Sequence, residues 1–457
     1  MKAEKVVQIV YRSQWILLVA AAPFLIFPSP RRSLALLVIP LLLLISWLAR
    51  REPIPATPLN GSLLLMALMV LVSSWATYDL RVSLSKITGV LLGFAVFWSF
   101  ARFGHNTNGW RWCLVCLLAT SLAMVGISLV GTVWVQSKFS LLARIAVLFP
   151  VRLTGLAGAE SGINPNQVAG SLLWVLPLSI SLAAGKLQRA ASQPSGGAWL
   201  QVAAAGALML FLLGVFLLAQ SRSAFLGLAL TLFFMLGLAM PRKGRAVLVV
   251  LLLMAVVGMA ILIQQGRLDF FSAIGLRTAS AENDATQLGT LENRLELWRR
   301  AIDAIQDFPL TGMGMNVFRQ AVHSLYPLFL ISPDVDVSHA HNEFLQAALD
   351  LGIPGLLAFI ALHVSAFAML AQVARQDPSR LTREEATGTQ LTWLLLGLGG
   401  GLVAHLLFGL TDAVALGAKT GILFWMLLGL IAGLHSRYLG EVRSRPAPLH
   451  DPDSGTQ

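Results

Sequence analysis

Charged residues are scarce in this sequence, since Asp, Glu, Lys and Arg together make up only 12% of its 457 residues. An ordinary soluble domain contains about 25% charged residues. Apolar runs of roughly twenty residues recur from end to end, and each can cross a bilayer as a helix. The composition excludes an ordinary soluble protein and predicts a polytopic membrane protein with one integral domain.

Cysteine is almost absent, because the chain has only Cys113 and Cys116, both inside an apolar run. We interpret them as small buried side chains on one helix face rather than as a redox or metal-binding pair. Acidic residues are fewer than basic ones, which gives a formal net charge of +11. In a membrane protein such an excess marks cytoplasmic loops or an anionic substrate, and it does not require nucleic acid as a partner.

The apolar runs predict an all-α fold with about twelve transmembrane helices. With the N-terminus in the cytoplasm, the segments assigned to the inside carry 18 Lys and Arg, and the short outside segments carry 6. This excess predicts that both termini are cytoplasmic and that two long loops, 135–166 and 265–342, lie on the opposite face, which is the periplasm if the cell is Gram-negative. The expected spans lie near 15–28, 33–49, 61–77, 84–101, 112–134, 167–185, 198–219, 223–240, 246–264, 343–372, 390–411 and 420–436.

This pattern divides the chain into four parts. Residues 1–264 are expected to form spans one to nine, and residues 265–342 a periplasmic loop with amphipathic helices. Residues 343–437 are expected to form spans ten to twelve, and residues 438–457 a disordered cytoplasmic tail.

Apolar residues recur at helical spacing inside the long loop 265–342. They predict an amphipathic helix that Thr290 caps and that Pro309 ends. A second helix is expected over about 316–325. The positions that define the apolar face of the first helix are Leu291, Leu295, Trp298, Ile302 and Ile305.

Three cations are expected near the outer ends of different spans, namely Lys86, Arg152 and Arg222. An ionisable group at membrane depth is costly and usually has a function or a partner. Arg binds phosphate through a planar fork of donors, and Lys binds it as a point charge. The three predict a site for a pyrophosphate, and snorkelling to lipid headgroups is the alternative for Lys86 and Arg222.

His339 and His341 stand at the boundary between the loop and span ten, and Asn342 is expected to cap that span. An imidazole with an ordinary pKa near 6.5 can accept a proton at neutral pH, so either histidine is a candidate general base. A polar helix cap without catalytic function is the alternative. His363 and His405 are single histidines within apolar runs, and we interpret both as satisfied core residues.

A metal site is another possible use of His339 and His341, since Asp334 and Asp336 are close in sequence. No further ligand cluster with clean spacing accompanies them in the sequence. We therefore expect no metal.

After His341 and Asn342, nine residues lead to Gly352-Ile353-Pro354-Gly355, whose Gly and Pro permit a kink or close helix packing. This spacing resembles the His-Asn-x9-Gly-x-x-Gly pattern of the O-antigen ligases, within a larger group that includes bacterial O-antigen polymerases. The similarity runs from about Ser83 to Gly433. Shorter matches are Asn164-Pro165-Asn166-Gln167-Val168-Ala169, Ser221-Arg222, Arg294 followed by Trp298, Gly312-Met313-Gly314 and Thr411-Asp412.

The resemblance implies a glycosyltransferase of the GT-C type in the bacterial inner membrane. Its donor would be a polysaccharide on undecaprenyl pyrophosphate, its acceptor lipid A–core, and its product lipopolysaccharide. Membrane lipids would be its other partners. The resemblance implies neither nucleotide nor metal, and no other cofactor.

The resemblance also implies an inverting displacement at the anomeric carbon. His341, or its neighbour His339, would accept the proton of the acceptor hydroxyl, or would only orient the acceptor, since pyrophosphate is already a good leaving group. Cations would neutralise the pyrophosphate as the glycosidic bond breaks. The candidates for that function are Arg222, Arg152, Lys86 and Arg294, although Arg294 could instead pair with Glu292 or Glu296. Further candidate site residues are Asn342, Asn166, Ser221 and Asp412.

Three other functions are compatible with parts of the sequence. An O-antigen polymerase would perform the same chemistry with a growing glycan as acceptor. A protein O-oligosaccharyltransferase is less favoured, because such proteins tend to carry extra periplasmic sequence after the last span. A transporter of lipid-linked sugars is disfavoured, because the ionisable residues cluster at one face and no inverted repeat is visible.

Overall fold

The structure is a computed structural model, and it describes residues 11, 13–106, 108–134, 140–155, 162–241, 243–247, 254, 291–376 and 388–444. These residues form helices joined by short connections, and the only extended pairing among them is an isolated parallel bridge between Thr132 and Ile163. The all-α fold is therefore as predicted.

The described helices are, in chain order, α2 (Gln14–Ile26), η1 (Arg32–Leu37), α3 (Val38–Arg50), α4 (Asn60–Ala76), α5 (Leu80–Gly104), α6 (Gly109–Gly131), α7 (Ser140–Ala146), α8 (Pro165–Leu172), α9 (Leu176–Ser192), α10 (Gly196–Leu218), α11 (Arg222–Ala239), α15 (Leu291–Asp307), α16 (Phe318–Leu325), α17 (Glu343–Ala374), α18 (Gly388–Gly409), η3 (Lys419–Gly421) and α19 (Ile422–Ser444).

Eight helices in the described part of the chain are long and apolar enough to cross a membrane. The pair α8 and α9, bent by 42°, passes the same test as one broken span, and α2 and α4 are shorter apolar helices. Most of the predicted span 246–264 lies outside the described residues, as do Thr290 and the end of the predicted tail. A multi-pass helical membrane protein is thus confirmed, and the number twelve stays a prediction.

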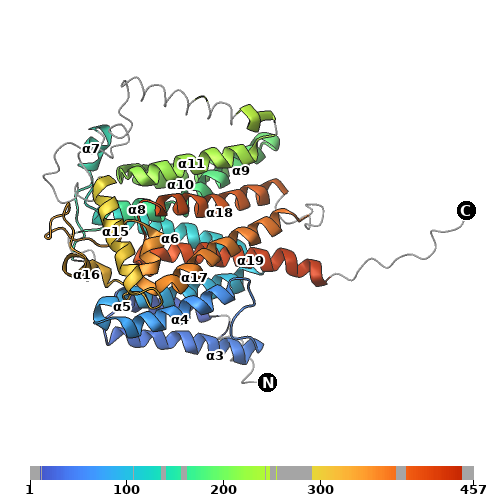
Figure 1. Cartoon of the computed structure of the whole chain (residues 1–457). Helices are drawn as coiled ribbons and strands as arrows, with labels where there is room; N and C mark the ends of the chain where they lie inside the picture. Colours follow the sequence, from blue (N-terminus) through green and yellow to red (C-terminus); the bar gives the residue numbers. More distant parts are fainter. Residues whose placement is uncertain are drawn as a thin grey trace, which may run out of the picture.

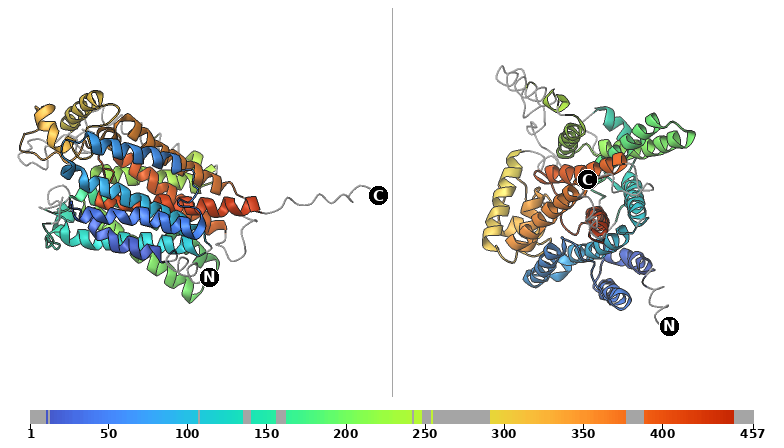
Figure 2. Two further views of the ribbon diagram at one scale, coloured as in Figure 1. Left: turned by 90° about the horizontal axis from the view of Figure 1, so that it is seen from below. Right: turned by 90° about the vertical axis from the view of Figure 1, so that its right-hand side faces the viewer.

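The long helices lie side by side as a bundle, and α15 crosses it at one end with α16 beside it (Figure 1). We call this end the loop end. Helix α19 lies near the middle of the bundle and packs against α5, α6 and α17 (Figure 2). The largest hydrophobic core surrounds α19, and a second, smaller core joins α15 and α16 to the start of α17.

The buried face of α15 differs from the predicted one. Leu297, Ala301 and Ala304 are fully buried, whereas Leu295 and Ile302 keep 40% and 44% of their surface exposed. The sequence pattern selects the largest apolar side chains, but close packing of α15 against α17 and α16 requires small ones. Helix α16 agrees with the predicted second helix of the loop.

Helix α17 is broken at Gly352, which has a φ of 69° and a ψ of 178°. A Cβ at this position would lie 2.6 Å from the carbonyl oxygen of Leu310, so only glycine fits. On either side of the break, Ile353 N donates to Pro309 O at 2.7 Å and Met313 N donates to Leu349 O at 2.8 Å. These bonds fix the segment after α15 to the first half of α17, and so position α15 relative to the residues that precede α17.

Candidate active site

A tight turn at the loop end leads into α17 and carries both candidate histidines. His341 has a φ of 48°, a left-handed conformation that is uncommon for a residue other than glycine. Asn342 then caps α17 as predicted, because its Oδ1 accepts the backbone N–H groups of Phe344 and Leu345, each at 3.0 Å. The Nδ2 of Asn342 donates to Leu410 O at 3.0 Å, so the turn is fixed to the segment that follows α18.

Buried polar side chains support this turn from within the bundle. Ala340 N donates to Gln346 Oε1 at 2.9 Å, and Gln346 Nε2 donates to Asp350 Oδ1 at 2.9 Å. The same carboxylate oxygen accepts the Asn316 N–H at 3.0 Å, and Ser73 of α4 donates to Asp350 O at 2.7 Å. The sequence analysis missed this network, although two polar residues four positions apart in an apolar run were a signal for it.

His339, His341 and Asp412 form a compact cluster, and they are only 4%, 6% and 1% exposed. The Nδ1 of His341 lies 3.1 Å from Asp412 Oδ1, and the Nε2 of His339 lies 3.8 Å from the same oxygen. The backbone N–H of His341 donates to His339 Nδ1 at 3.2 Å, and the two ring centroids are 4.4 Å apart. One carboxylate therefore faces both imidazoles.

The hydrogen bonds define where the protons lie in this cluster. The Asp412 carboxylate can only accept, so the Nδ1 of His341 is the donor and carries a proton. His339 Nδ1 is an acceptor, which leaves the proton of its neutral ring on Nε2, the atom facing Asp412. The Nε2 of His341 is buried without a hydrogen-bond partner in the described structure, and its lone pair is available for a proton.

Burial and nearby charges shift the pKa values of His339 and Asp412. Burial, together with the charges of His341, Lys86 and Arg294, lowers the pKa of His339 to about 3, although Asp412 opposes the shift. Burial by itself would raise the pKa of Asp412, but the charges of His341, His339 and Arg294 and the hydrogen bond from His341 outweigh it and lower that pKa. At neutral pH the cluster therefore combines an ionised carboxylate with a neutral His339.

Two residues of α15, four positions apart, hydrogen-bond to the two segments that carry the cluster. The Nη1 of Arg294 donates to Thr411 O at 2.5 Å and lies 3.5 Å from Ser223 Oγ, at the start of α11. The Nε1 of Trp298 donates to His341 O at 3.3 Å. Residues at this spacing share one face of a helix, which is why α15 can hold both His341 and the segment of Asp412.

Arg222 is the first residue of α11, where the chain turns sharply out of α10. It follows Gln220, which has a φ of 47°, and the buried Ser221. The guanidinium groups of Arg222 and Arg294 are close enough to interact electrostatically. Two like charges converge here beside Thr411, which is the electrostatic environment that an anion requires.

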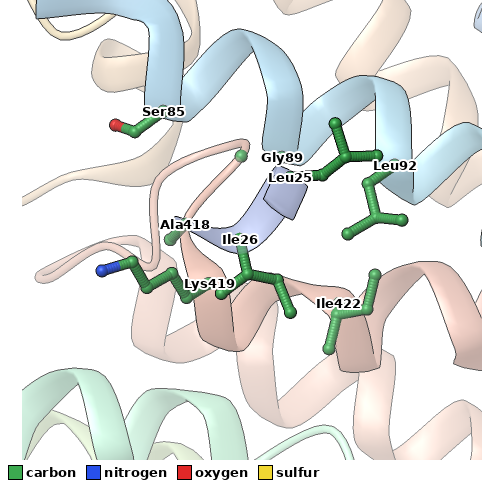
Figure 3. A pocket seen from close by; sticks show the side chains of 9 residues that line it. Leu25, Ile26, Ser85, Gly89, Leu92, Ala418, Lys419 and Ile422 are labelled. Atoms are coloured by element: carbon green, nitrogen blue, oxygen red, sulfur yellow. The ribbon is translucent and has the colours of Figure 1, made fainter. Parts of the chain in front are cut away.

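The loop that carries Asp412 rests on α5 next to Lys86. Gly417 has a φ of 78°, and a Cβ there would lie 2.1 Å from Lys86 O. Figure 3 shows the neighbouring residues Ala418 and Lys419 beside α5 at Gly89. The Lys86 ammonium interacts electrostatically with His339, Asp350 and Glu343.

An apolar pocket opens in this region, between α2, α5 and the start of α19 (Figure 3). Its polar members are Ser85 and Lys419, and the Nζ of Lys419 lies 4.6 Å from the ring centroid of Phe27. The pocket contains neither histidine of the cluster nor Asp412. The cluster, and not this pocket, combines the ionisable groups needed for chemistry.

Two candidates lie apart from the cluster. Arg152 is exposed in the segment after α7, and its backbone N–H donates to Val130 O, near the end of α6, at 2.7 Å. Asn166 lies in the first turn of α8, where its backbone N–H donates to Asn164 Oδ1 at 2.8 Å. In the part of the chain that the structure describes, no hydrogen bond or ion pair joins either side chain to the histidines.

Residues 207–360 match a family model described as O-antigen ligase. The matched stretch begins in α10 and ends in α17, and it contains Arg222, Arg294, His339 and His341. No curated protein matches the sequence. The match thus covers the centre of the cluster, while Asp412 lies outside it.

Proposed function

We propose, from the premise that this chain belongs to the O-antigen ligase family through residues 207–360, that it transfers O-antigen polysaccharide from undecaprenyl pyrophosphate to lipid A–core. Family membership by itself makes it a glycosyltransferase of the O-antigen ligase and polymerase type. The observation that carries the finer proposal is the buried pair of Asp412 and His341, with the free Nε2 of His341. The neighbouring His339 interacts electrostatically with the cations Arg294 and Lys86.

His341 acts as the general base in this proposal. Its Nε2 takes the proton of the acceptor hydroxyl while that oxygen attacks the anomeric carbon and the bond from carbon to pyrophosphate oxygen breaks, with inversion. Asp412 keeps the Nδ1 proton in place and stabilises the imidazolium that forms, as a carboxylate does for histidine in a catalytic triad. His339 is the weaker candidate, because a pKa of about 3 makes it a poor proton acceptor at neutral pH.

The cations assist departure of the pyrophosphate. Arg294 and Arg222 present guanidinium forks, which match phosphate oxygens with two hydrogen bonds each. Lys86 adds a positive charge near His339. Arg152 would join them only when a bound donor extends to the end of α6. Fixed positive groups at the position where negative charge develops are often the largest single contribution to catalysis.

The reaction would take place on the periplasmic side of the bacterial inner membrane, with both termini in the cytoplasm. This orientation rests on the excess of Lys and Arg in the segments assigned to the inside. Neither nucleotide nor other cofactor is required by the proposal, because the energy of the donor lies in its pyrophosphate bond.

A transfer assay with purified protein in proteoliposomes tests the function. One sample receives the lipid-linked polysaccharide with lipid A–core, and another receives lipid-linked repeat units alone. We expect mass spectrometry to detect glycosylated lipid A–core in the first sample and no lengthened glycan in the second. Longer lipid-linked glycans would identify a polymerase, and movement across the membrane without a covalent product would identify a transporter.

Arg222→Lys should reduce kcat/KM for the donor by about tenfold or more, since lysine keeps the charge but loses the fork that binds phosphate bidentately. The steady-state rate of transfer at varied donor concentration measures this effect. Arg81→Lys is the matched control, because Arg81 is exposed in the first turn of α5. An Arg222→Lys variant with the activity of wild type would mean that charge alone is needed at this position.

Transfer should persist in excess chelator. One ligand-type atom each from His339, His341 and Asp412 lies within 4.8 Å of the others, so the cluster has the composition of a metal site. Two of these groups already hydrogen-bond to each other, and the third accepts a backbone N–H. Activity that disappears with chelator, and that a divalent ion alone restores, would make the cluster a metal site instead.

A further inference from the structure

Three consecutive residues, which begin at His341, contact the end of α18 and the segment that follows it. His341 contacts Asp412, and Asn342 donates to Leu410 O at 3.0 Å. The next residue, Glu343, has its Oε2 2.6 Å from the Nε2 of His405. The first two contacts belong to the site described above, and the third lies deeper in the bundle and has no function in the proposed chemistry.

The imidazole of His405 contacts a different group on each side. His405 Nδ1 lies 3.1 Å from the carbonyl oxygen of Gly170, which can only accept, so Nδ1 carries a proton. On the other side of the ring, Nε2 lies 2.6 Å from Glu343 Oε2, a contact that is an ion pair when the imidazole is protonated. The carboxylate of Glu343 therefore faces the ring nitrogen that has no hydrogen-bond partner in the described structure.

The surroundings of this pair are closed. His405 and Glu343 are 1% and 4% exposed, and the imidazole stacks on Trp174 with ring centroids 4.0 Å apart. A Cβ at Gly409 would lie 3.0 Å from Glu343 Oε2, so α18 passes directly over the carboxylate. Burying two ionisable groups seldom stabilises a fold more than apolar residues of the same volume would, and such pairs are better explained by specificity of position.

We infer that Glu343 and His405 are a positioning pair that sets the angle of the His341 imidazole relative to Asp412. Glu343 is the first residue of α17 and lies two positions after His341. Its contact with His405 of α18 therefore determines how the turn at His341 enters α17. Gly170 extends the same connection to α8, the helix that begins at Pro165. This inference rests on the proposed function, since it concerns the geometry of the proposed base.

The pair is expected to affect turnover rather than binding of the donor. His405 contacts Glu343 and hydrogen-bonds to Gly170 O, whereas Arg294, proposed to hold the pyrophosphate, hydrogen-bonds to Thr411 O. A displacement of the base by about 1 Å can reduce a rate by about 10²-fold. A loss confined to kcat is therefore the signature of a tilted His341.

The test compares the rates of glycan transfer by Glu343→Gln, His405→Gln and the double variant in proteoliposomes. Each rate is expressed per mole of monodisperse protein. We expect each single change to lower kcat about tenfold to a hundredfold, with KM for the donor within about twofold of wild type. In the double variant two neutral amides can hydrogen-bond to each other, so kcat should be no lower than in either single variant. His363→Gln is the matched control, because this buried histidine of α17 hydrogen-bonds within its own helix, to Phe359 O at 3.0 Å.

Three outcomes would overturn the inference. The first is a wild-type kcat in Glu343→Gln, and the second is losses that multiply in the double variant. The third is a loss that His363→Gln reproduces, which would indicate general sensitivity of the bundle. Including His341→Ala separates the two proposals. A wild-type protein that forms no glycosylated lipid A–core would overturn the proposed function, and an active His341→Ala would remove the general-base assignment. If His341→Ala is inactive while Glu343→Gln is normal, only the positioning pair fails.

Discussion

His341→Ala should abolish glycan transfer while the protein still inserts into the membrane. The variant loses the one imidazole nitrogen in the His339–His341–Asp412 cluster that is free to accept a proton, and general base catalysis contributes about 10²–10⁴ in rate. Trp298 bonds to the backbone oxygen of residue 341, and Asn342 caps α17 independently, so the helix should still form. Lipopolysaccharide in a strain that depends on the variant, together with the purified transfer assay, measures the effect.

His323→Ala is the matched control for this change. His323 lies in α16 at the same end of the bundle, and its Nε2 contacts Val335 O at 2.8 Å, away from the cluster. Its removal should leave transfer close to wild type. Near-normal lipopolysaccharide from His341→Ala, with the variant present at the wild-type level, would remove the general-base assignment and favour a histidine that only orients the acceptor.

Asp412→Asn should lower kcat by about 10²–10⁴. In a catalytic triad, loss of the carboxylate partner of the histidine lowers kcat by up to about 10⁴. An asparagine amide has nearly the same shape but supplies no negative charge to the imidazolium that forms at His341. It can also present its NH₂ group to the ring, which would favour the tautomer with the proton on Nε2. The change tests the charge of Asp412 with little change in packing.

The lowered pKa of Asp412 also predicts how the stability of the protein depends on pH. Its carboxyl group has a lowered pKa in the folded protein, so it contributes stability that is present above its unfolded pKa and is lost as pH falls through the folded one. The free energy of unfolding of Asp412→Asn should therefore be lower than that of wild type at neutral pH, and the difference between the two should shrink in strong acid. Asp336→Asn, which removes an exposed carboxylate paired with Arg319, is the control. A neutral-pH activity equal to wild type in Asp412→Asn would exclude Asp412 as the partner of the base.

Much of this architecture could be predicted from local patterns. Apolar runs define the spans, and the His341-Asn342 pair followed by Gly352 locates both a cap and a break in α17. The helical spacing of the apolar residues from Leu291 to Ile305 correctly predicted a helix in the long loop. These features depend on residues within a few turns of one another, which is why a sequence alone contains them.

Contacts between distant helices could not be predicted in the same way. His341 and Asp412 are 71 positions apart, and His405 and Glu343 are 62 apart, so their meeting depends on how α17 and α18 are rotated against each other. His405 was correctly interpreted as a buried residue, but its carboxylate partner had no sequence signal. The face of α15 was misjudged because small alanines, rather than large apolar side chains, set the distance to α17.

The two hydrogen bonds across the break at Gly352 have a consequence for the way substrates are held. They join the segment after α15 to the first half of α17, and Trp298 of α15 donates to His341 O at 3.3 Å. Helix α15, which carries Arg294, is therefore attached to the turn that carries His341, although 46 residues separate the two in the sequence. Any substrate-induced shift of α15 must then move both side chains together. In the proposed reaction the spacing from phosphate to attacking oxygen would then stay constant, and glycans of different length would meet the same reaction distance.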